Sequence, residues 1–219
     1  LTADWRRTHD PEPADQLLER ILEERRTQWE KRYRSVRYEV KDKEPPRGWK
    51  KRYDEPGTFD EEQDLPKLPE SWTWTNLEQL KVFSRYGPRF SSDDYEENGH
   101  FVVRTTDISE HGKVDTQSAP RIPLNETDTV KYQLRRGDLV ITRTGSIGTL
   151  AVFNDDVECI AGAYLIQFRP VRTKILPWYV FNVFKSPSAQ RYLKEGSSGV
   201  GRPNLNAPTI ESYPIPLPP

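Results

Sequence analysis

The clearest pattern near the start of the chain is a stripe of apolar side chains at helical spacing. Residues 13–33 carry this stripe on one face and mainly Glu and Arg elsewhere; its members are Ala14, Leu17, Leu18, Ile21, Leu22 and Trp29. Apolar positions at this spacing are typical of an amphipathic helix, and Pro13 suits its first turn. An isolated helix of this kind is unstable. The stripe must therefore pack on the core of the following domain or on a partner.

The hydrophobic pattern is lost between residues 41 and 67. Lys, Asp, Glu, Pro and Gly dominate this stretch, and aliphatic side chains are few. Such a composition predicts a polar linker or an extended arm rather than a packed domain. We expect three aromatic residues, Trp49, Tyr53 and Phe59, to hold it against the neighbouring surface.

Beyond Trp72 the pattern predicts mostly strands. Short β-branched or aromatic runs alternate with turn residues; the runs are residues 82–83, 101–103, 139–141, 150–153 and 164–168. Residues 176–194 then show a helical apolar face with a break at Ser186-Pro187. The pattern as a whole favours an α+β, β-rich domain with a bent, mostly antiparallel sheet and a few helices.

Composition changes this picture mainly through the distribution of charge. The chain has 219 residues, enough for one sizeable domain with an appendage, and a net charge of −1. Residues 131–202 hold 11 Lys and Arg against 5 Asp and Glu, a net of +6, whereas residues 71–130 have a net of −4. A basic half with Gly-rich loops is typical of a phosphate-binding surface. The alternative is an ordinary solvated face.

Metal sites, disulfides and membrane spans find no support in the sequence. The single cysteine, Cys159, lies in an apolar run and is expected to be a small buried hydrophobe. With one cysteine no disulfide can form within the chain, which agrees with a reducing compartment. His9, His100 and His111 lack partners at metal-ligand spacing. No apolar run approaches the roughly 20 residues of a membrane helix, so we expect a soluble, cytoplasmic protein.

Two Gly-rich segments hold most of the candidate chemistry. Arg143–Gly148 joins two predicted strands, and Gly196–Asn206 follows the last predicted helix, so glycines there let the backbone approach a partner closely. Arg, Asn, Ser and Thr side chains can read base edges or hold phosphates. The candidate DNA-binding residues are Arg85, Arg89, Arg104, Arg143, Thr144, Ser146, Lys194, Ser197, Ser198, Arg202 and Asn204. The alternative is a set of turns whose polar groups satisfy their own backbone.

Four motifs occur in a characteristic order. They are Leu68–Trp72, Arg104–Ile108, Gly137–Gly148 and the segment from Gly196 to Pro219, which ends on Pro-Ile-Pro-Leu-Pro-Pro. Together they resemble the target recognition domain of the DNA specificity (S) subunit of Type I restriction-modification systems. Leu1–Arg6 and the helix at residues 13–33 are similar to the end of that family's central spacer. The resemblance implies a second recognition domain excised from a longer subunit.

The resemblance also implies an organisation and a function. Residues 1–40 would be the end of the central spacer, 41–67 the polar arm, and 68–219 the DNA target recognition domain. The chain would read one half of a bipartite double-stranded DNA target. It would direct adenine methylation or cleavage by methylation (M) and restriction (R) subunits. S-adenosylmethionine, ATP and Mg would then belong to those partners, and no cofactor to this chain.

Other functions remain open at this point. The sequence shows neither the cofactor loop nor the Asn/Asp-Pro-Pro-aromatic motif of an adenine methyltransferase, and Ser146 has no histidine partner in a triad-like order. We therefore expect no catalytic residues. The alternatives are the recognition module of a fused methyltransferase-endonuclease and a protein–protein scaffold that uses the amphipathic helix.

We expect Arg202→Ala, in the full subunit, to impair DNA recognition while leaving folding nearly unchanged, because Gly199 and Gly201 favour an exposed loop. Loss of a bidentate base contact would cost roughly 1–3 kcal/mol of discrimination. Loss of a phosphate contact would weaken all sequences alike and lower the salt slope by about one. Thermal unfolding beside a titration with specific and scrambled DNA measures both. A large fall in Tm with an unchanged specificity ratio would instead mean that Glu195 or Glu211 holds Arg202.

Overall fold

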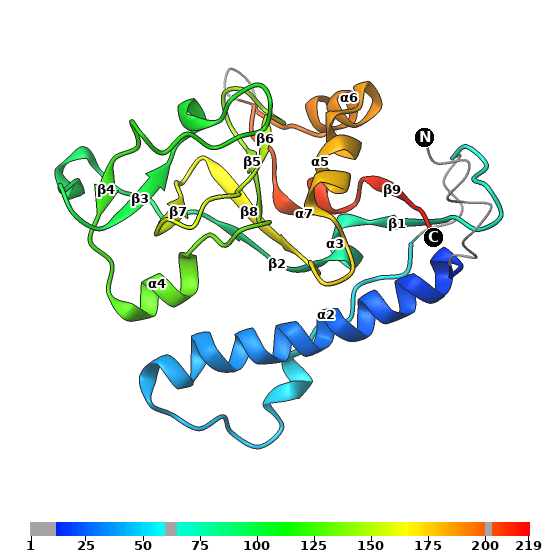
Figure 1. Cartoon of the computed structure of the whole chain (residues 1–219), viewed down its shortest axis with the longest axis horizontal. Coiled ribbons are helices and arrows are strands. Elements are labelled where there is room, and N and C mark those ends of the chain that lie inside the picture. The colour runs from blue at the N-terminus through cyan, green and yellow to red at the C-terminus, as the bar shows by residue number, and fades with distance from the viewer. Residues whose placement is uncertain (1–11, 60–64, 200–202) are drawn as a thin grey trace.

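The computed structural model describes residues 12–59, 65–199 and 203–219 (Figure 1). It begins with the 24-residue helix α2 (Ala14–Arg37), which runs alongside a body of sheets and short helices. The arm after α2 contains short 3-10 turns at Glu39–Lys41 and Trp49–Arg52. The α+β class predicted from the sequence is confirmed. Leu1–Arg6 and Arg202 lie outside the described residues.

Strands of the described part form three sheets. The largest has the order β2-β8-β5-β6 and is antiparallel throughout. A second has the order β4-β3-β7, with a parallel β3–β7 pair. The third pairs β1 with β9, so that Thr73 lies opposite Leu217 and the body closes on itself. The bounds are β1 (Thr73–Asn76), β2 (Lys81–Tyr86), β3 (His100–Val103), β4 (Arg121–Ile122), β5 (Leu139–Thr142), β6 (Leu150–Val152), β7 (Cys159–Ala161), β8 (Leu165–Pro170) and β9 (Pro214–Leu217).

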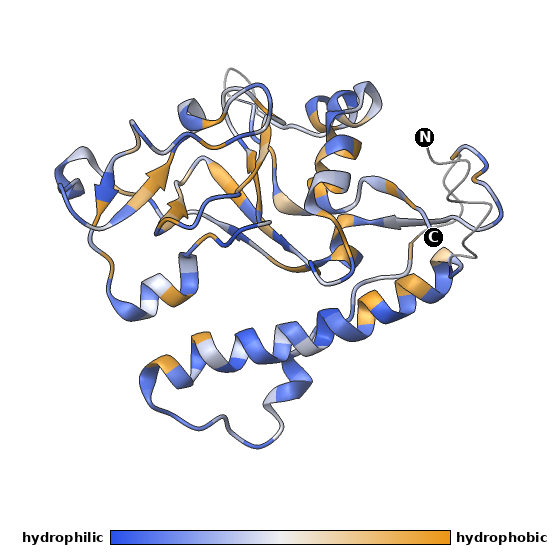
Figure 2. Cartoon of the chain, viewed as in Figure 1, coloured by the Kyte–Doolittle hydropathy of each residue, from blue (hydrophilic) through white to orange (hydrophobic). Residues whose placement is uncertain are grey.

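Short helices cover the large sheet and the body's ends. They are α3 (Leu77–Leu80), α4 (Glu126–Tyr132), α5 (Pro177–Lys185), α6 (Pro187–Glu195) and α7 (Ala207–Glu211), with 3-10 turns at Ser92–Asp94 and Thr105–Asp107. Ser186 ends α5 and caps α6, accepting a hydrogen bond from the Ala189 amide (3.3 Å). Phe184 and Leu193 from these helices join the core of the large sheet. Figure 2 shows its central strands as mainly hydrophobic, whereas α2 is mainly hydrophilic outside its stripe.

The apolar stripe of α2 covers the body's own core. Ala14 and Ile21 are fully buried, and Leu17 and Leu18 are partly buried against the same cluster. The helix lies along α3 and along β2, which is an edge strand of the large sheet (Figure 1). Arg25, one turn after Ile21, is also buried, and its Nε donates to the Lys81 carbonyl of β2 (2.9 Å). A charged side chain thus supplements the apolar contact.

The three aromatic residues of the arm pack as predicted. Trp49 stacks on Tyr33 of α2, with ring centroids 5.8 Å apart, and Tyr53 meets Trp29 edge-on at 5.2 Å. Phe59 stacks on Trp74 at 6.5 Å. Aromatic contacts, rather than aliphatic burial, therefore hold the polar arm against its neighbours.

Cys159 is confirmed as a buried hydrophobe. Its thiol is completely inaccessible, and burial raises its pKa to about 12. A thiol with so high a pKa is unreactive at neutral pH. In the described ranges, no helix has both the length and the apolar character needed to cross a membrane.

A buried carboxylate ties the large sheet together. Asp138, just before β5, has no exposed surface and accepts hydrogen bonds from Arg169 Nε (2.7 Å) and Nη2 (2.6 Å) on β8. Gln167 Nε2 (2.7 Å) and the Arg135 amide (2.8 Å) also donate to it. Four donors satisfy this carboxylate, which is the condition under which a buried charge is tolerated.

We expect Asp138→Asn to destabilise the fold by about 3–5 kcal/mol, because it leaves Arg169 buried without a counter-charge. At roughly 2–4 °C per kcal/mol for a chain of this size, Tm should fall by roughly 6–20 °C. The matched control is Asp156→Asn, which removes an exposed carboxylate 3.9 Å from Arg136 and should cost less than about 1 kcal/mol. Equal urea midpoints for the two variants would contradict the role of Asp138.

Candidate nucleic-acid interface

The turn between β5 and β6 is braced from within. The Thr142 hydroxyl donates to the Ser146 carbonyl and accepts from the Thr149 amide (3.1 Å). Gly145 and Gly148 adopt left-handed backbone angles, with φ of 75° and 78°, which glycine accepts without a Cβ penalty. The turn is therefore held in shape while Ser146 stays exposed. This confirms the tight connection expected from the glycines.

Arg143 joins this turn to two other loops. Its amide donates to the Tyr164 carbonyl (3.0 Å), and its carbonyl accepts from the Leu205 amide (2.8 Å). Its Nε donates to Asn204 Oδ1 (3.0 Å), and the guanidinium lies over the Tyr86 ring, 4.5 Å from the centroid. Within the described part of the chain its two terminal nitrogens make no further hydrogen bond. Arg143 is thus a planar donor held in a fixed orientation by its neighbours.

Residues Ser198 and Asn204 of the C-terminal segment pair with each other beside this turn. Ser198 and Asn204 exchange backbone hydrogen bonds (3.1 and 2.7 Å), and Asn204 also bridges to Thr144. The Ser197 hydroxyl donates to the Lys194 carbonyl at the end of α6 (2.6 Å). The side chain of Lys194 is exposed. Among these predicted residues, Asn204 therefore connects to the turn most directly.

Gln190 fixes α6 against the same turn. Its Nε2 donates to the Gly148 carbonyl (3.0 Å) and to the Phe184 carbonyl at the end of α5 (2.7 Å). Lys194, one turn further along α6, thus lies on the helix that supports the turn. Its side chain makes no ion pair with another described residue.

The chain leaving β2 completes the same edge. Gly87 lies so close to the turn between β7 and β8 that a Cβ would stand 2.1 Å from the Ala161 carbonyl oxygen and 2.2 Å from that of Gly162. Arg89 and Phe90 follow, and with Tyr164 they line a hollow of about 710 Å³. Tyr164 is 54% exposed. We call the set of residues 86–90, 143–148, 162–164, 198 and 204 the loop edge.

Arg85 and Arg104 each have a hydrogen-bond partner within the protein, and Arg104 also lines the hollow beside Arg89. Arg85 Nη1 donates to the Lys131 carbonyl (2.9 Å), and burial lowers the pKa of its guanidinium. Arg104 donates to Asp107 through Nε (3.0 Å) and Nη2 (2.8 Å), and its hydrogen bonds with this carboxylate raise its pKa. Any DNA contact by either residue would use only the remaining N–H groups.

Sequence reasoning singled out Tyr86 and Phe90, which alternate with Arg85 and Arg89, but it missed Tyr164. Tyr164 looked like the first residue of a strand, yet β8 begins only at Leu165. An exposed tyrosine between two glycine-rich turns was the available signal. The acidic residues at 93–97 carry no metal-type cluster: in the described ranges no three His, Cys, Asp or Glu side chains gather as metal ligands. Asp94 instead accepts from the Ser91 amide (2.7 Å).

Comparisons with known proteins show a family and a similar fold. Residues 69–219 match the family model of the Type I restriction modification DNA specificity domain. The fold is similar to the HsdS subunit from Thermoanaerobacter tengcongensis, with a TM-score of 0.53 and 19% identity over 94% of this chain and 44% of that one. The fold is also similar to a structure described for complex assembly and conformational transition of the type I R-M system. The TM-score is 0.54 and the identity 18%, over 94% of this chain and 45% of that one. The chain therefore spans less than half the length of both. No curated protein sequence matches it.

We expect Gly87→Ala to cost at least about 1–3 kcal/mol of stability, because the added Cβ meets two backbone oxygens that cannot move independently. Gly145→Ala, which meets nothing within 4 Å, should cost only the left-handed strain of about 1–2 kcal/mol. Gly57→Ala, also in open space, should change stability by less than about 0.5 kcal/mol. Urea unfolding of the three variants measures their free energies of unfolding and so ranks their stabilities. Stability of Gly87→Ala equal to that of Gly57→Ala would disprove the close approach.

Proposed function

Because this chain belongs to the family of Type I restriction-modification DNA specificity domains, we propose that its loop edge binds double-stranded DNA and reads one half of a bipartite target. The observation that supports this most directly is the position of Arg143. It lies where the turn at 143–148, the bridge at Asn204 and the chain leaving β2 meet. Segments far apart in the sequence thus present polar side chains at one edge.

The chemistry of this edge suits a division between base reading and phosphate binding. A guanidinium that is stacked on Tyr86 and oriented by Asn204 resembles the preorganised fork that donates to both acceptors of a guanine. Arg89 and Lys194 are exposed cations, and such groups position a protein on the phosphate backbone. Ser146 adds a hydroxyl that can donate to or accept from a base or a phosphate.

We further propose that the chain works without catalysis of its own, as part of a specificity subunit. In this proposal the subunit positions methylation subunits, which use S-adenosylmethionine, and restriction subunits, which use ATP and Mg. The family match supports this assignment. The two similar structures support it only through their fold, since their identity to this chain is below 20%.

The target has to be found before binding can be measured. A map of methylated adenines in the source genome would identify it. Binding of the full subunit, assembled with its methylation subunits, would then be measured on target and scrambled duplexes across a range of salt concentrations. We expect Arg143→Ala to lose about 1–3 kcal/mol of discrimination between the two duplexes. Arg143→Lys should keep the salt slope but not the discrimination, because a lysine lacks the planar fork.

Arg89→Ala should behave differently, since a lost phosphate contact weakens both duplexes alike and lowers the salt slope by about one. Lys51→Ala on the arm removes an exposed cation and is the matched control, which should change neither quantity. Unchanged discrimination in Arg143→Ala would refute the assignment of the loop edge. Absence of salt-dependent DNA binding in the unaltered subunit would favour the protein–protein scaffold instead.

A further inference from the structure

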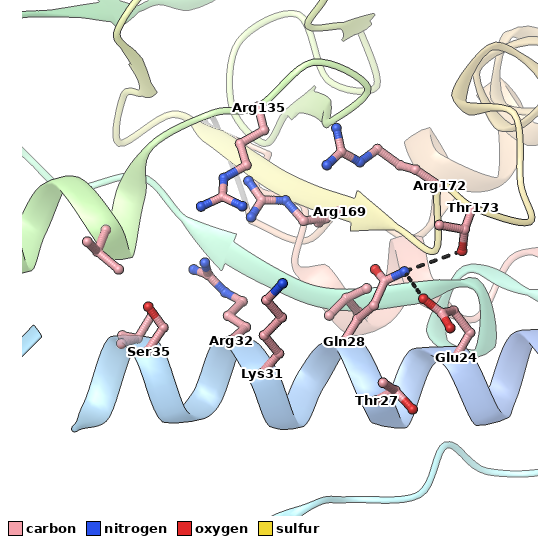
Figure 3. Close-up of a pocket in the computed structure, with 13 residues that line it drawn as sticks. Glu24, Thr27, Gln28, Lys31, Arg32, Ser35, Arg135, Arg169, Arg172 and Thr173 are labelled. Atoms are coloured by element: carbon pink, nitrogen blue, oxygen red, sulfur yellow. Dashed lines mark hydrogen bonds between the residues drawn. The ribbon is translucent and has the colours of Figure 1, made fainter. Parts of the chain in front are cut away.

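A second cationic feature lies at the other end of the β2–β8 ladder. Tyr86 pairs with Ile166 near the loop edge, whereas Lys81 pairs with Pro170 at the far end. There, between α2 and the large sheet, lies a pocket of about 670 Å³ (Figure 3). Its basic lining residues are Lys31, Arg32, Arg135, Arg169 and Arg172. We call it the arginine pocket.

These cations come from separate parts of the chain and face one space. Lys31 and Arg32 lie on α2, Arg135 precedes β5, and Arg169 and Arg172 come from the end of β8 and the residues after it. Figure 3 shows Lys31, Arg32, Arg135 and Arg169 pointing into the same region. Like charges gathered this closely repel one another unless an anion lies between them.

The arginines are held in place chiefly by neutral partners. Arg32 lies over the Phe83 ring, 3.7 Å from its centroid, and its Nη2 donates to the Lys131 carbonyl (2.8 Å). Of the five basic residues, Arg169 is the one paired with a carboxylate, that of Asp138. The Arg135 side chain makes no hydrogen bond to another described residue. Arg32 and Arg169 are thus held in position, and apart from the Arg169–Asp138 pair these cations form no ion pair with a described carboxylate.

The pKa values point in the same direction. Burial, followed by the neighbouring charges of Arg169 and Arg85, lowers the pKa of Arg32 to about 9. Burial and Arg169 also lower the pKa of Arg135. Both shifts mean that the surroundings disfavour the charged form. A bound anion would reverse that effect.

We propose that the arginine pocket binds a small anion that carries several phosphate groups. Five cations face the carboxylates of Glu24 and Asp138, which leaves three positive charges. A single carboxylate ligand would neutralise only one of them. Arginine forks match the paired oxygens of phosphate groups. The pocket also has an apolar part of its lining, formed by Val36, Val82 and Val130. The site is separate from the loop edge and does not depend on the proposed DNA contacts.

Glu24 and Gln28 set one boundary of this site. Gln28 Nε2 donates to Glu24 Oε1 (2.7 Å) and reaches Thr173 Oγ1 (3.4 Å) on the opposite wall (Figure 3). The carboxylate repels an anion from that end. The anion should therefore contact Arg32 and Arg135 rather than the N-terminal half of α2.

The test is a titration of the full chain with sodium tripolyphosphate, pyrophosphate and orthophosphate by calorimetry, at constant ionic strength set with sodium chloride. We expect saturable binding of one tripolyphosphate, with affinity falling as the number of phosphate groups falls. Arg135→Gln should weaken binding at least about tenfold, the size expected for one lost charge-assisted contact. Arg34→Gln is the matched control: Arg34 is on the same helix but pairs with Glu39 (2.9 Å) outside the pocket, and its loss should leave affinity unchanged.

Thermal unfolding separates this role from a structural one. Without anion, Arg135→Gln should keep or raise the Tm, because it removes a repelled charge, and it should lose most of the rise in Tm that tripolyphosphate causes. A lower Tm without anion and an unchanged rise would show that Arg135 is only structural. Arg143→Ala should leave tripolyphosphate binding intact, which separates this proposal from DNA binding. The proposal would be overturned if tripolyphosphate gave no more heat of binding than the sodium chloride control. It would also be overturned if the pocket were saturated by duplex DNA and not by tripolyphosphate.

Discussion

The carboxylate of Asp138 holds the centre of the large sheet by accepting four hydrogen bonds in a place that water does not reach. It neutralises Arg169 on β8 and fixes the start of β5 beside it. Because Arg169 lies on β8, which pairs with both β2 and β5, this ion pair links the start of β5 to a central strand of the sheet. Removing either charge would leave the other buried and unpaired, a cost that few local contacts can offset.

The two ends of the β2–β8 ladder have different chemistry. At one end, glycines allow loops to approach closely, and Arg143 is left oriented among aromatic and amide neighbours. At the other, the same Arg169 that satisfies Asp138 repels Arg32 and Arg135 and creates an electropositive pocket. Arg169 therefore belongs both to the structural ion pair and to the arginine pocket, of which α2 forms one wall.

Helix α2 and the arm show how much of the structure can be predicted from the local sequence pattern. The apolar period predicted the helix, and the aromatic residues predicted how the arm is held; both are confirmed. Helical periodicity is a property of the local sequence. Which surface the stripe covers was left open by the sequence. The structure places Ile21 in the body's own core and adds Arg25, which a pattern of hydrophobic positions could not identify.

The sequence by itself determined the strand-rich body, the tight turn at residues 143–148, the buried Cys159 and the family, since these depend on local periodicity, glycine positions and motif order. Only the tertiary structure decided which arginines face a ligand. Arg85 and Arg104 looked like Arg143 in the sequence, yet Arg85 is partly buried against the Lys131 carbonyl and Arg104 is paired with Asp107. The arginine pocket was likewise invisible, because Arg32 and Arg135 meet only after the chain has folded. Partners of charged groups are set by long-range pairing, about which local sequence carries little information.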